Sequence, residues 1–162
     1  MERDTELLEL LEADSRLTHK QLADMLGMPE ELVAQRIRAL EEEGAILCYR
    51  TVVNWEKVGR ERVSAFIKVK VMPQRDVGFD AVAERIYRFP EVNSVYLVSG
   101  DYDLAVLVEG ESMKEVAHFV ATKLSTIDGV VSTSTHFVLK AYKQEGVILA
   151  DTEENKRLVV TP

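Results

Sequence analysis

A turn between two apolar runs holds the residues most able to do chemistry in this sequence. The stretch VYLVSGDYDLAVLVEG, residues 95–110, places Gly100, Asp101, Tyr102 and Asp103 between two segments typical of strands. A hairpin needs only a Gly beside an Asn or Asp to reverse the chain. Reversal of the chain therefore does not explain the second carboxylate and the aromatic ring of this turn. Two neighbouring carboxylates suit an acid/base pair or a ligand-binding turn. Ordinary turn chemistry is the simpler interpretation.

Catalysis has little support elsewhere in the sequence. The histidines His19, His118 and His136 are scattered, without the spacing of a metal-binding pair. The sequence has no GxSxG, P-loop or GxGxxG motif. Nothing in it predicts the pKa separation that Asp101 and Asp103 would need as an acid/base pair. We therefore expect neither an enzyme nor a cofactor or metal site.

The composition is that of a globular protein with an acidic surface. Of its 162 residues, 46% are hydrophobic and 30% are charged, and the net charge is −8. This acidity argues against indiscriminate nucleic-acid binding but is compatible with a local basic stripe. There is no signal peptide and no membrane-length apolar run, so we expect a cytoplasmic protein. Cys48 is the single cysteine, which excludes an intramolecular disulfide, and we expect it to be buried.

The first third of the chain predicts three short helices. Apolar residues at helical spacing are Leu7, Leu8 and Leu11, then Leu22 and Leu26, then Val33, Ile37 and Leu40. Thr18 and Gln21 form a capping box for the second helix, which Gly27 ends. The third helix begins at Pro29 and ends at Gly44. Two helices joined by a short Gly turn indicate a helix-turn-helix, and the β-branched segment AILCYRTVVN that follows is consistent with a small wing.

The third helix is the candidate DNA-binding element, because the second helix of such a motif enters the major groove. The residues expected to contact DNA are Lys20, Gln35, Arg36, Arg38 and Arg50. Gln and Arg bind adenine and guanine edges, whereas Lys20 and Arg50 are placed to hold phosphates. Glu30 and Glu31 at the start of the helix oppose the prediction. Carboxylates there repel DNA unless one accepts a hydrogen bond from a cytosine amino group.

The remaining hundred residues predict the order β-α-β-β-α-β. One face of the first strand would hold Val63, Ala65, Ile67, Val69 and Val71. Helical stripes follow at Phe79, Val82, Ile86 and Phe89, and at Met113, Val116, Ala117, Val120 and Leu124. The order is the ferredoxin-like split βαβ pattern, an α+β fold in which the helices cover one face of the sheet. Phe66 adds an apolar residue to the other face, which predicts burial against a second subunit in at least a homodimer.

This combination resembles the Lrp/AsnC family of bacterial and archaeal transcription regulators, over about residues 4–143. The matching segments are QLADMLGMPEELVAQRIRALEEEGAI, CYRTVVNWEKVG, VSGDYDLAVLV and IDGVVSTSTHFVL. We accordingly expect four regions: a winged helix-turn-helix over 1–53, a linker over 54–60, a ferredoxin-like effector-binding and oligomerisation domain over 61–143 and a C-terminal extension over 144–162.

The resemblance implies a regulator of double-stranded DNA tuned by a small effector such as an amino acid. In the family, dimers form through the sheet and assemble further, with effector sites between dimers. The matching positions here are Gly100, Asp101, Tyr102 and Asp103 in the turn, with Thr133 and Thr135 on the last strand. Asp101 and Asp103 would bind the effector's ammonium group, and the turn amides and the two threonines would bind its carboxylate.

Two alternatives stay open at the level of the sequence. Some proteins similar to this family are decarboxylases acting on sirohaem, and an acidic recognition helix suits such a loss of DNA binding. Against this, the C-terminal half lacks the clustered His and Arg that a tetrapyrrole carboxylate would favour. The other alternative is a ligand-sensing protein whose helix-turn-helix has become an interaction surface.

Overall fold

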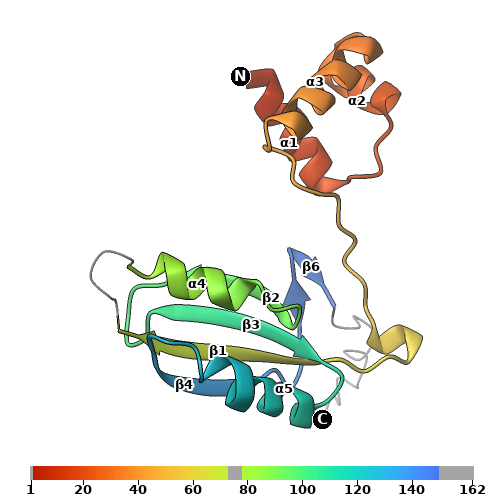
Figure 1. The fold of residues 1–162 in the computed structure, drawn as a ribbon. Helices are drawn as coiled ribbons and strands as arrows, with labels where there is room; N and C mark the ends of the chain where they lie inside the picture. Colours follow the sequence, from red (N-terminus) through yellow and green to blue (C-terminus); the bar gives the residue numbers. More distant parts are fainter. Residues whose placement is uncertain (1, 73–77, 150–162) are drawn as a thin grey trace, which may run out of the picture. The chain divides into compact units, whose positions relative to one another are not determined.

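The structure is a computed structural model that describes residues 2–72 and 78–149 (Figure 1). The chain divides into two compact units, residues 1–52 and residues 53–162, and each has its own hydrophobic core. No helix of the described part is long and apolar enough to cross a membrane. Val77, where the sequence suggests that a helix begins, and residues 150–162 of the expected extension lie outside the described residues.

Three helices form the N-terminal unit: α1 (Glu2–Ala13), α2 (His19–Leu26) and α3 (Glu30–Glu42). Their core consists of the residues that helical spacing predicts, with one addition, Ala23. The buried members are Leu7, Leu11, Leu22, Ala23, Val33, Ile37 and Leu40, with Leu8 and Leu26 packed against them. The prediction of three amphipathic helices is confirmed.

The turn between α2 and α3 has the caps that the sequence predicts. The Gln21 backbone N–H donates to Thr18 Oγ1 at 3.2 Å, and the Thr18 N–H donates to Gln21 Oε1 at 2.8 Å. Gly27 follows α2 in the left-handed conformation at φ 61°, and α3 begins directly after Pro29. Local hydrogen bonds and backbone preferences thus set the angle at which α3 leaves the turn.

Residues 45–54 follow α3 without forming a strand, although their composition suggested a small wing. Tyr49 attaches part of the segment to α3, because its hydroxyl donates to Glu41 Oε1 at 2.9 Å. The prediction that Cys48 is buried is wrong, since its side chain is exposed. No described strand pairs with this segment, so Cys48 has no sheet or core to pack into.

The C-terminal unit has the predicted β-α-β-β-α-β order, preceded by a short 3-10 helix at Glu56–Val58. Its elements are β1 (Val63–Val71), α4 (Asp80–Tyr87), β2 (Val92–Leu97), β3 (Leu104–Gly110), α5 (Met113–Phe119) and β4 (Val130–Phe137). The four strands form one antiparallel sheet in the order β2-β3-β1-β4, so β1 and β3 are central. This is the ferredoxin-like α+β topology expected from the sequence.

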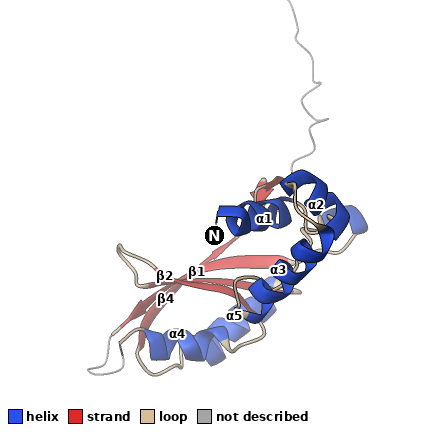
Figure 2. Cartoon of the chain, turned by 90° about the horizontal axis from the view of Figure 1, so that it is seen from above, coloured by secondary structure: helices blue, strands red, loops and turns tan. Residues whose placement is uncertain are grey.

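The two faces of the sheet differ in what covers them. Alternate residues of β1, from Ala65 to Val71, are buried against residues of α4 and α5, so both helices cover one face (Figure 2). The intervening residues of β1 point the other way. No described helix of this unit covers that second side, which we call the open face. The open face includes Phe66, Lys68, Tyr96, Ala105, Leu107, Ser134 and His136.

Two elements of this unit differ from their predicted form. α5 continues into a π-helical turn, Val120–Leu124, whose hydrogen bonds span five residues. This turn brings Leu124 onto the side of Phe119, and both are buried, whereas regular helical spacing predicts the burial of Leu124 without that of Phe119. The run VVSTSTHFVLKAY suggests a strand that reaches residue 142, but β4 ends at Phe137, opposite Ala65, and beyond it the Val138 N–H donates to the Ser64 carbonyl at 2.8 Å.

Part of the expected C-terminal extension is folded as a hairpin. The strands β5 (Lys143–Gln144) and β6 (Val147–Ile148) pair in antiparallel fashion. Glu145 and Gly146 form the turn between them, and both have positive φ angles, as a tight hairpin turn requires. Residues 144–148 are therefore part of a regular element, which the polar sequence of this stretch did not indicate.

Candidate functional site

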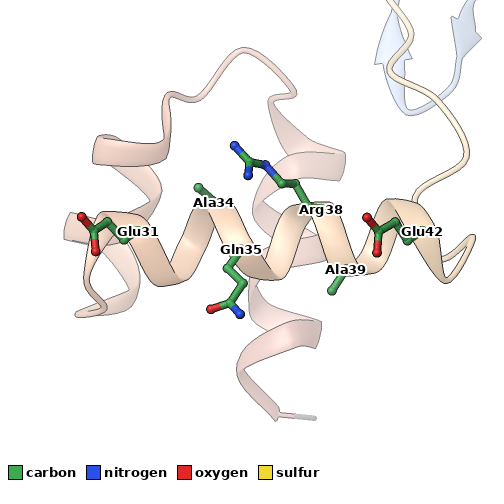
Figure 3. A pocket seen from close by; sticks show the side chains of 6 residues that line it. All are labelled: Glu31, Ala34, Gln35, Arg38, Ala39 and Glu42. Atoms are coloured by element: carbon green, nitrogen blue, oxygen red, sulfur yellow. The ribbon is translucent and has the colours of Figure 1, made fainter.

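One face of α3 is exposed along its length and forms an open pocket (Figure 3). The residues that line it are Glu31, Ala34, Gln35, Arg38, Ala39 and Glu42. This face lies opposite the buried Val33, Ile37 and Leu40, as expected from a helix that turns by about 100° per residue. Ala34 and Ala39 leave room beside the longer polar side chains, so the groups of a partner can reach them.

Four of the five residues predicted to contact DNA are exposed. Gln35 and Arg38 lie in the α3 pocket, and their side chains form no hydrogen bond or ion pair with another residue in the described ranges. Lys20 is exposed on α2, and Arg50 is exposed on the segment that follows α3. The structure therefore leaves these four side chains accessible to a partner of the N-terminal unit.

Arg36 is the exception, because it pairs with α1. Its Nε donates to Asp4 Oδ1 at 2.8 Å, and its Nη2 donates to Asp4 Oδ2 at 2.6 Å. The Arg36 guanidinium lowers the pKa of Asp4 to about 2. A bidentate pair of this kind fixes the planar guanidinium. Arg36 thus holds α1 against α3 and lies outside the pocket that contains Arg38.

The turn of residues 98–103 joins β2 to β3. Gly100 has a φ of 150°, a conformation that residues with a side chain rarely adopt. Asp103 Oδ2 accepts a hydrogen bond from the backbone N–H of Val71 at 2.7 Å. This bond satisfies a donor at the point where the pairing of β1 with β4 shifts register. Asp103 therefore holds the end of the sheet, a role that explains the turn's second carboxylate without a ligand.

Asp101 lies beside Lys68 and Tyr102. Lys68 Nζ is 3.5 Å from Asp101 Oδ2 and 4.9 Å from the centroid of the Tyr102 ring, which meets Phe66 edge to face with centroids 6.1 Å apart. The Asp101 side chain is 79% exposed, so the ion pair contributes little stability. The backbone N–H groups of residues 100–102 donate to no acceptor in the described part of the chain. The turn thus presents a cation, an anion, free amides and an aromatic ring together.

Within one chain, Thr133 and Thr135 lie apart from this cluster, so their predicted contact with an effector would require a site shared between subunits. In the ladder of β1 with β4, Thr135 pairs with Ile67 and Thr133 with Val69, and both partners are buried beneath the helices. The threonines therefore lie on the covered face, where Thr133 Oγ1 is 3.2 Å from Ser125 Oγ. Asp101 and Tyr102 meet residues of the open face instead.

Sequence reasoning left Phe66, Lys68 and His136 out of the candidate site. His136 pairs with Phe66 across the ladder, their ring centroids lie 6.5 Å apart, and His136 Nε2 is 3.2 Å from Ser134 Oγ. Strand alternation puts Phe66 and Lys68 on one face of β1. The missing information was the strand order, which brings β4 and the turn before β3 to the two sides of β1.

Comparison with known proteins extends these observations. A family model described as the Lrp/AsnC ligand binding domain matches residues 64–148, and one described as a winged helix-turn-helix DNA-binding domain matches residues 2–46. The uncharacterized HTH-type transcriptional regulator YugG of Bacillus subtilis is 52% identical over 162 residues, which cover 99% of this chain and 98% of that protein.

Two solved structures share the fold of the whole chain. A transcriptional regulator of Neisseria meningitidis in complex with L-methionine has a TM-score of 0.71 and 26% identity, over 89% of this chain and 92% of that chain. The leucine response regulatory protein of Mycobacterium tuberculosis has a TM-score of 0.74 and 28% identity, over 90% of this chain and 96% of that chain.

The fold and these relatives together define a transcriptional regulator with a helix-turn-helix DNA-binding domain and a separate ligand-binding domain. The chain belongs to the Lrp/AsnC family. Its relatives bear the names of transcriptional regulators, and the family is one of regulators rather than enzymes. The sirohaem decarboxylase alternative is therefore discarded.

The role of Asp103 predicts a difference between the two turn carboxylates. Asp103→Ala should lower the free energy of unfolding by about 1–3 kcal/mol, because the partly buried Val71 N–H loses its acceptor. Asp101→Ala removes an exposed carboxylate of the same turn and should change it by less than about 0.5 kcal/mol. Urea denaturation followed by circular dichroism compares them. Equal stability of the two variants would show that Asp103 does not support the sheet.

Proposed function

We propose that the protein binds DNA sequence-specifically through α3, and that an amino acid bound on the open face of the C-terminal unit modulates this activity where subunits meet. The observation that best supports the proposal is a pair of side chains, Gln35 and Arg38, that have no partner among the described residues and lie on the face of α3 opposite its core stripe. Membership of a family of regulators with a ligand-binding domain supports both DNA binding and effector binding.

DNA recognition by α3 follows from the side chains that it exposes. Arg38 has the donors to bind the O6 and N7 atoms of a guanine, and Gln35 has the donor and acceptor to bind an adenine. Lys20 and Arg50 are exposed on elements next to α3 in the chain and suit phosphate contacts. Arg36 has a different role in this proposal: by pairing with Asp4 it keeps α3 in place.

An amino-acid effector matches the charges beside the turn. The ammonium of Lys68 and the carboxylate of Asp101 mirror the carboxylate and ammonium of a zwitterion. The free N–H groups of residues 100–102 can add donors for the effector's carboxylate, and the rings of Phe66 and Tyr102 provide an apolar wall. The relative from Neisseria meningitidis forms a complex with L-methionine, which supports an amino acid as the class of ligand.

A second copy of the chain is the proposed cover of the open face. Large apolar side chains there are exposed in the single chain: Tyr96 to 57% and Leu107 to 38%. The described helices of this unit cover the opposite face, and a sheet with apolar residues on both faces needs a second layer. Such a homodimer, which we propose assembles further, would place the cluster around Lys68 close to the contact between subunits.

The remaining alternative is a ligand sensor whose helix-turn-helix does not bind DNA. The observation that favours it is the pair of carboxylates, Glu30 and Glu31, in the first turn of α3. Binding of DNA by the folded protein decides between the two functions, and the next prediction gives the residue-level form of that test.

Arg38→Ala should weaken binding to a duplex selected by the wild-type protein by about 1–3 kcal/mol, because a contact to a base edge is lost. Fluorescence anisotropy of the labelled duplex measures the change. Arg85→Ala is the matched control, since it removes an exposed arginine of α4 in the other unit, and its affinity should equal that of the wild type. An Arg38→Ala protein that binds as tightly as this control would exclude Arg38 from the interface.

Asp101→Asn and Lys68→Gln should each weaken effector binding about tenfold or more, because each loses a charge-assisted hydrogen bond. Calorimetric titration with pooled amino acids identifies the effector for the wild type, and the single compound is then titrated into the variants. Asp128→Asn is the control, because it changes a carboxylate that is 87% exposed in another loop. Undiminished binding by Asp101→Asn would refute the proposed site.

Leu107→Glu should yield monomers at micromolar concentration, because association would bury an unpaired carboxylate in the middle of the open face. Sedimentation velocity measures the mass. Met25→Glu changes a side chain of α2 that is 61% exposed, and this control should keep the mass of the wild-type oligomer. A wild-type monomer, or a Leu107→Glu variant that still dimerises, would contradict association through the sheet.

A further inference from the structure

The acidic residue Glu31 lies on the same stripe of α3 as the basic residue Arg38. The two are seven residues apart, which corresponds to two helical turns and about 10 Å along the axis. Gln35 lies between them, about 6 Å from Glu31 along the axis. Figure 3 shows Glu31 at the N-terminal end of the exposed face and Glu42 at its C-terminal end, with Gln35 and Arg38 between them.

Stabilisation of the helix end favours an acidic residue in this turn but does not select the face of the helix on which it lies. Pro29 at the N-cap gives no side-chain hydrogen bond, so the free N–H groups and the dipole of α3 favour carboxylates in its first turn. This effect does not depend on the face of the helix, and Glu30, which lies outside the pocket, already supplies such a carboxylate. The side chain of Glu31 is exposed, forms no hydrogen bond or ion pair with another described residue and lines the pocket with Gln35.

A carboxylate on this face is repelled by most of what DNA presents. Phosphates repel it, and in the major groove guanine and thymine present no hydrogen-bond donor to it. Adenine places its amino donor next to the acceptor N7, whereas cytosine presents an amino donor alone. The N-terminal residues of a recognition helix are the ones that contact base edges. Glu31, at the second position of α3, is therefore placed to discriminate among bases.

We propose that Glu31 is a specificity-determining residue that accepts a hydrogen bond from the amino group of a cytosine. Gln35 then contacts an adenine and Arg38 a guanine along the same groove. Because successive base pairs are about 3.4 Å apart, the axial spacings place these contacts about two and about three base pairs from the cytosine. The target is a duplex with a G·C pair, one unassigned base pair, an A·T pair and a second G·C pair in succession. This inference rests on the DNA-binding function proposed above.

The test is selection of bound duplexes from a randomised library by the full-length protein without effector. The wild type is expected to select a cytosine at one position. Anisotropy should give a roughly five- to 150-fold lower affinity when that base is guanine or thymine. The Glu31→Gln variant should lose this preference, because an amide offers both a donor and an acceptor. It should keep the preferences at the base pairs assigned to Gln35 and Arg38.

The matched control is Glu42→Gln, which removes one carboxylate from the other end of the same face. It should strengthen binding to all duplexes by one factor and leave base preference unchanged, since only general repulsion is reduced. If Glu31→Gln also raises all affinities alike, Glu31 acts through net charge, and the inference fails while DNA binding stands. If the wild type is folded and selects no duplex, the proposed DNA-binding function fails together with the inference.

Discussion

The alternation of side chains across one four-stranded sheet is the constraint on which the C-terminal unit depends. Because neighbouring residues of β1 point to opposite sides, Ile67 enters the core beneath α4 and α5 while Lys68 stands on the open face. The same rule separates Thr135 from His136 on β4. The open face therefore holds both the groups that could bind a ligand and the apolar side chains that require burial. Effector binding and subunit association, as proposed here, would be coupled by this shared surface.

The N-terminal unit obeys the corresponding constraint of helical period. α3 directs Val33, Ile37 and Leu40 into the core, so its polar residues are concentrated on one outer face. That face combines a carboxylate, an amide and a guanidinium at successive turns. In an acidic protein, such a face would not favour general attraction to phosphates, so it would bind DNA tightly only where base contacts offset repulsion. Acidic residues such as Glu31 would then both give the chain its negative charge and provide the proposed base specificity.

Local patterns predicted the main helices and strands, both cores and the caps of α2, because residues such as Thr18, Gln21 and Gly27 act on neighbours in the chain. They did not indicate the hairpin of β5 and β6. These local patterns did not predict pairings between residues that are distant in the sequence. Arg36 bonds Asp4 on another helix, and Asp103 bonds the N–H of Val71 across the sheet. The sequence suggested that each of these side chains could bind a ligand or DNA, whereas in the fold each is bonded to another part of the chain. The strand order likewise decided that the threonines of β4 lie away from the turn.

The most direct measurement is fluorescence anisotropy of a labelled duplex from upstream of the protein's own gene. The titration is made at several salt concentrations, with and without pooled amino acids. We expect tight binding whose affinity falls with salt, and a shift in affinity on adding one pool, because in the proposed function ligand binding in one unit controls DNA binding by the other. Absence of binding at low salt, by a protein shown to be folded and with or without amino acids, would contradict the assignment of α3 as a DNA-reading helix.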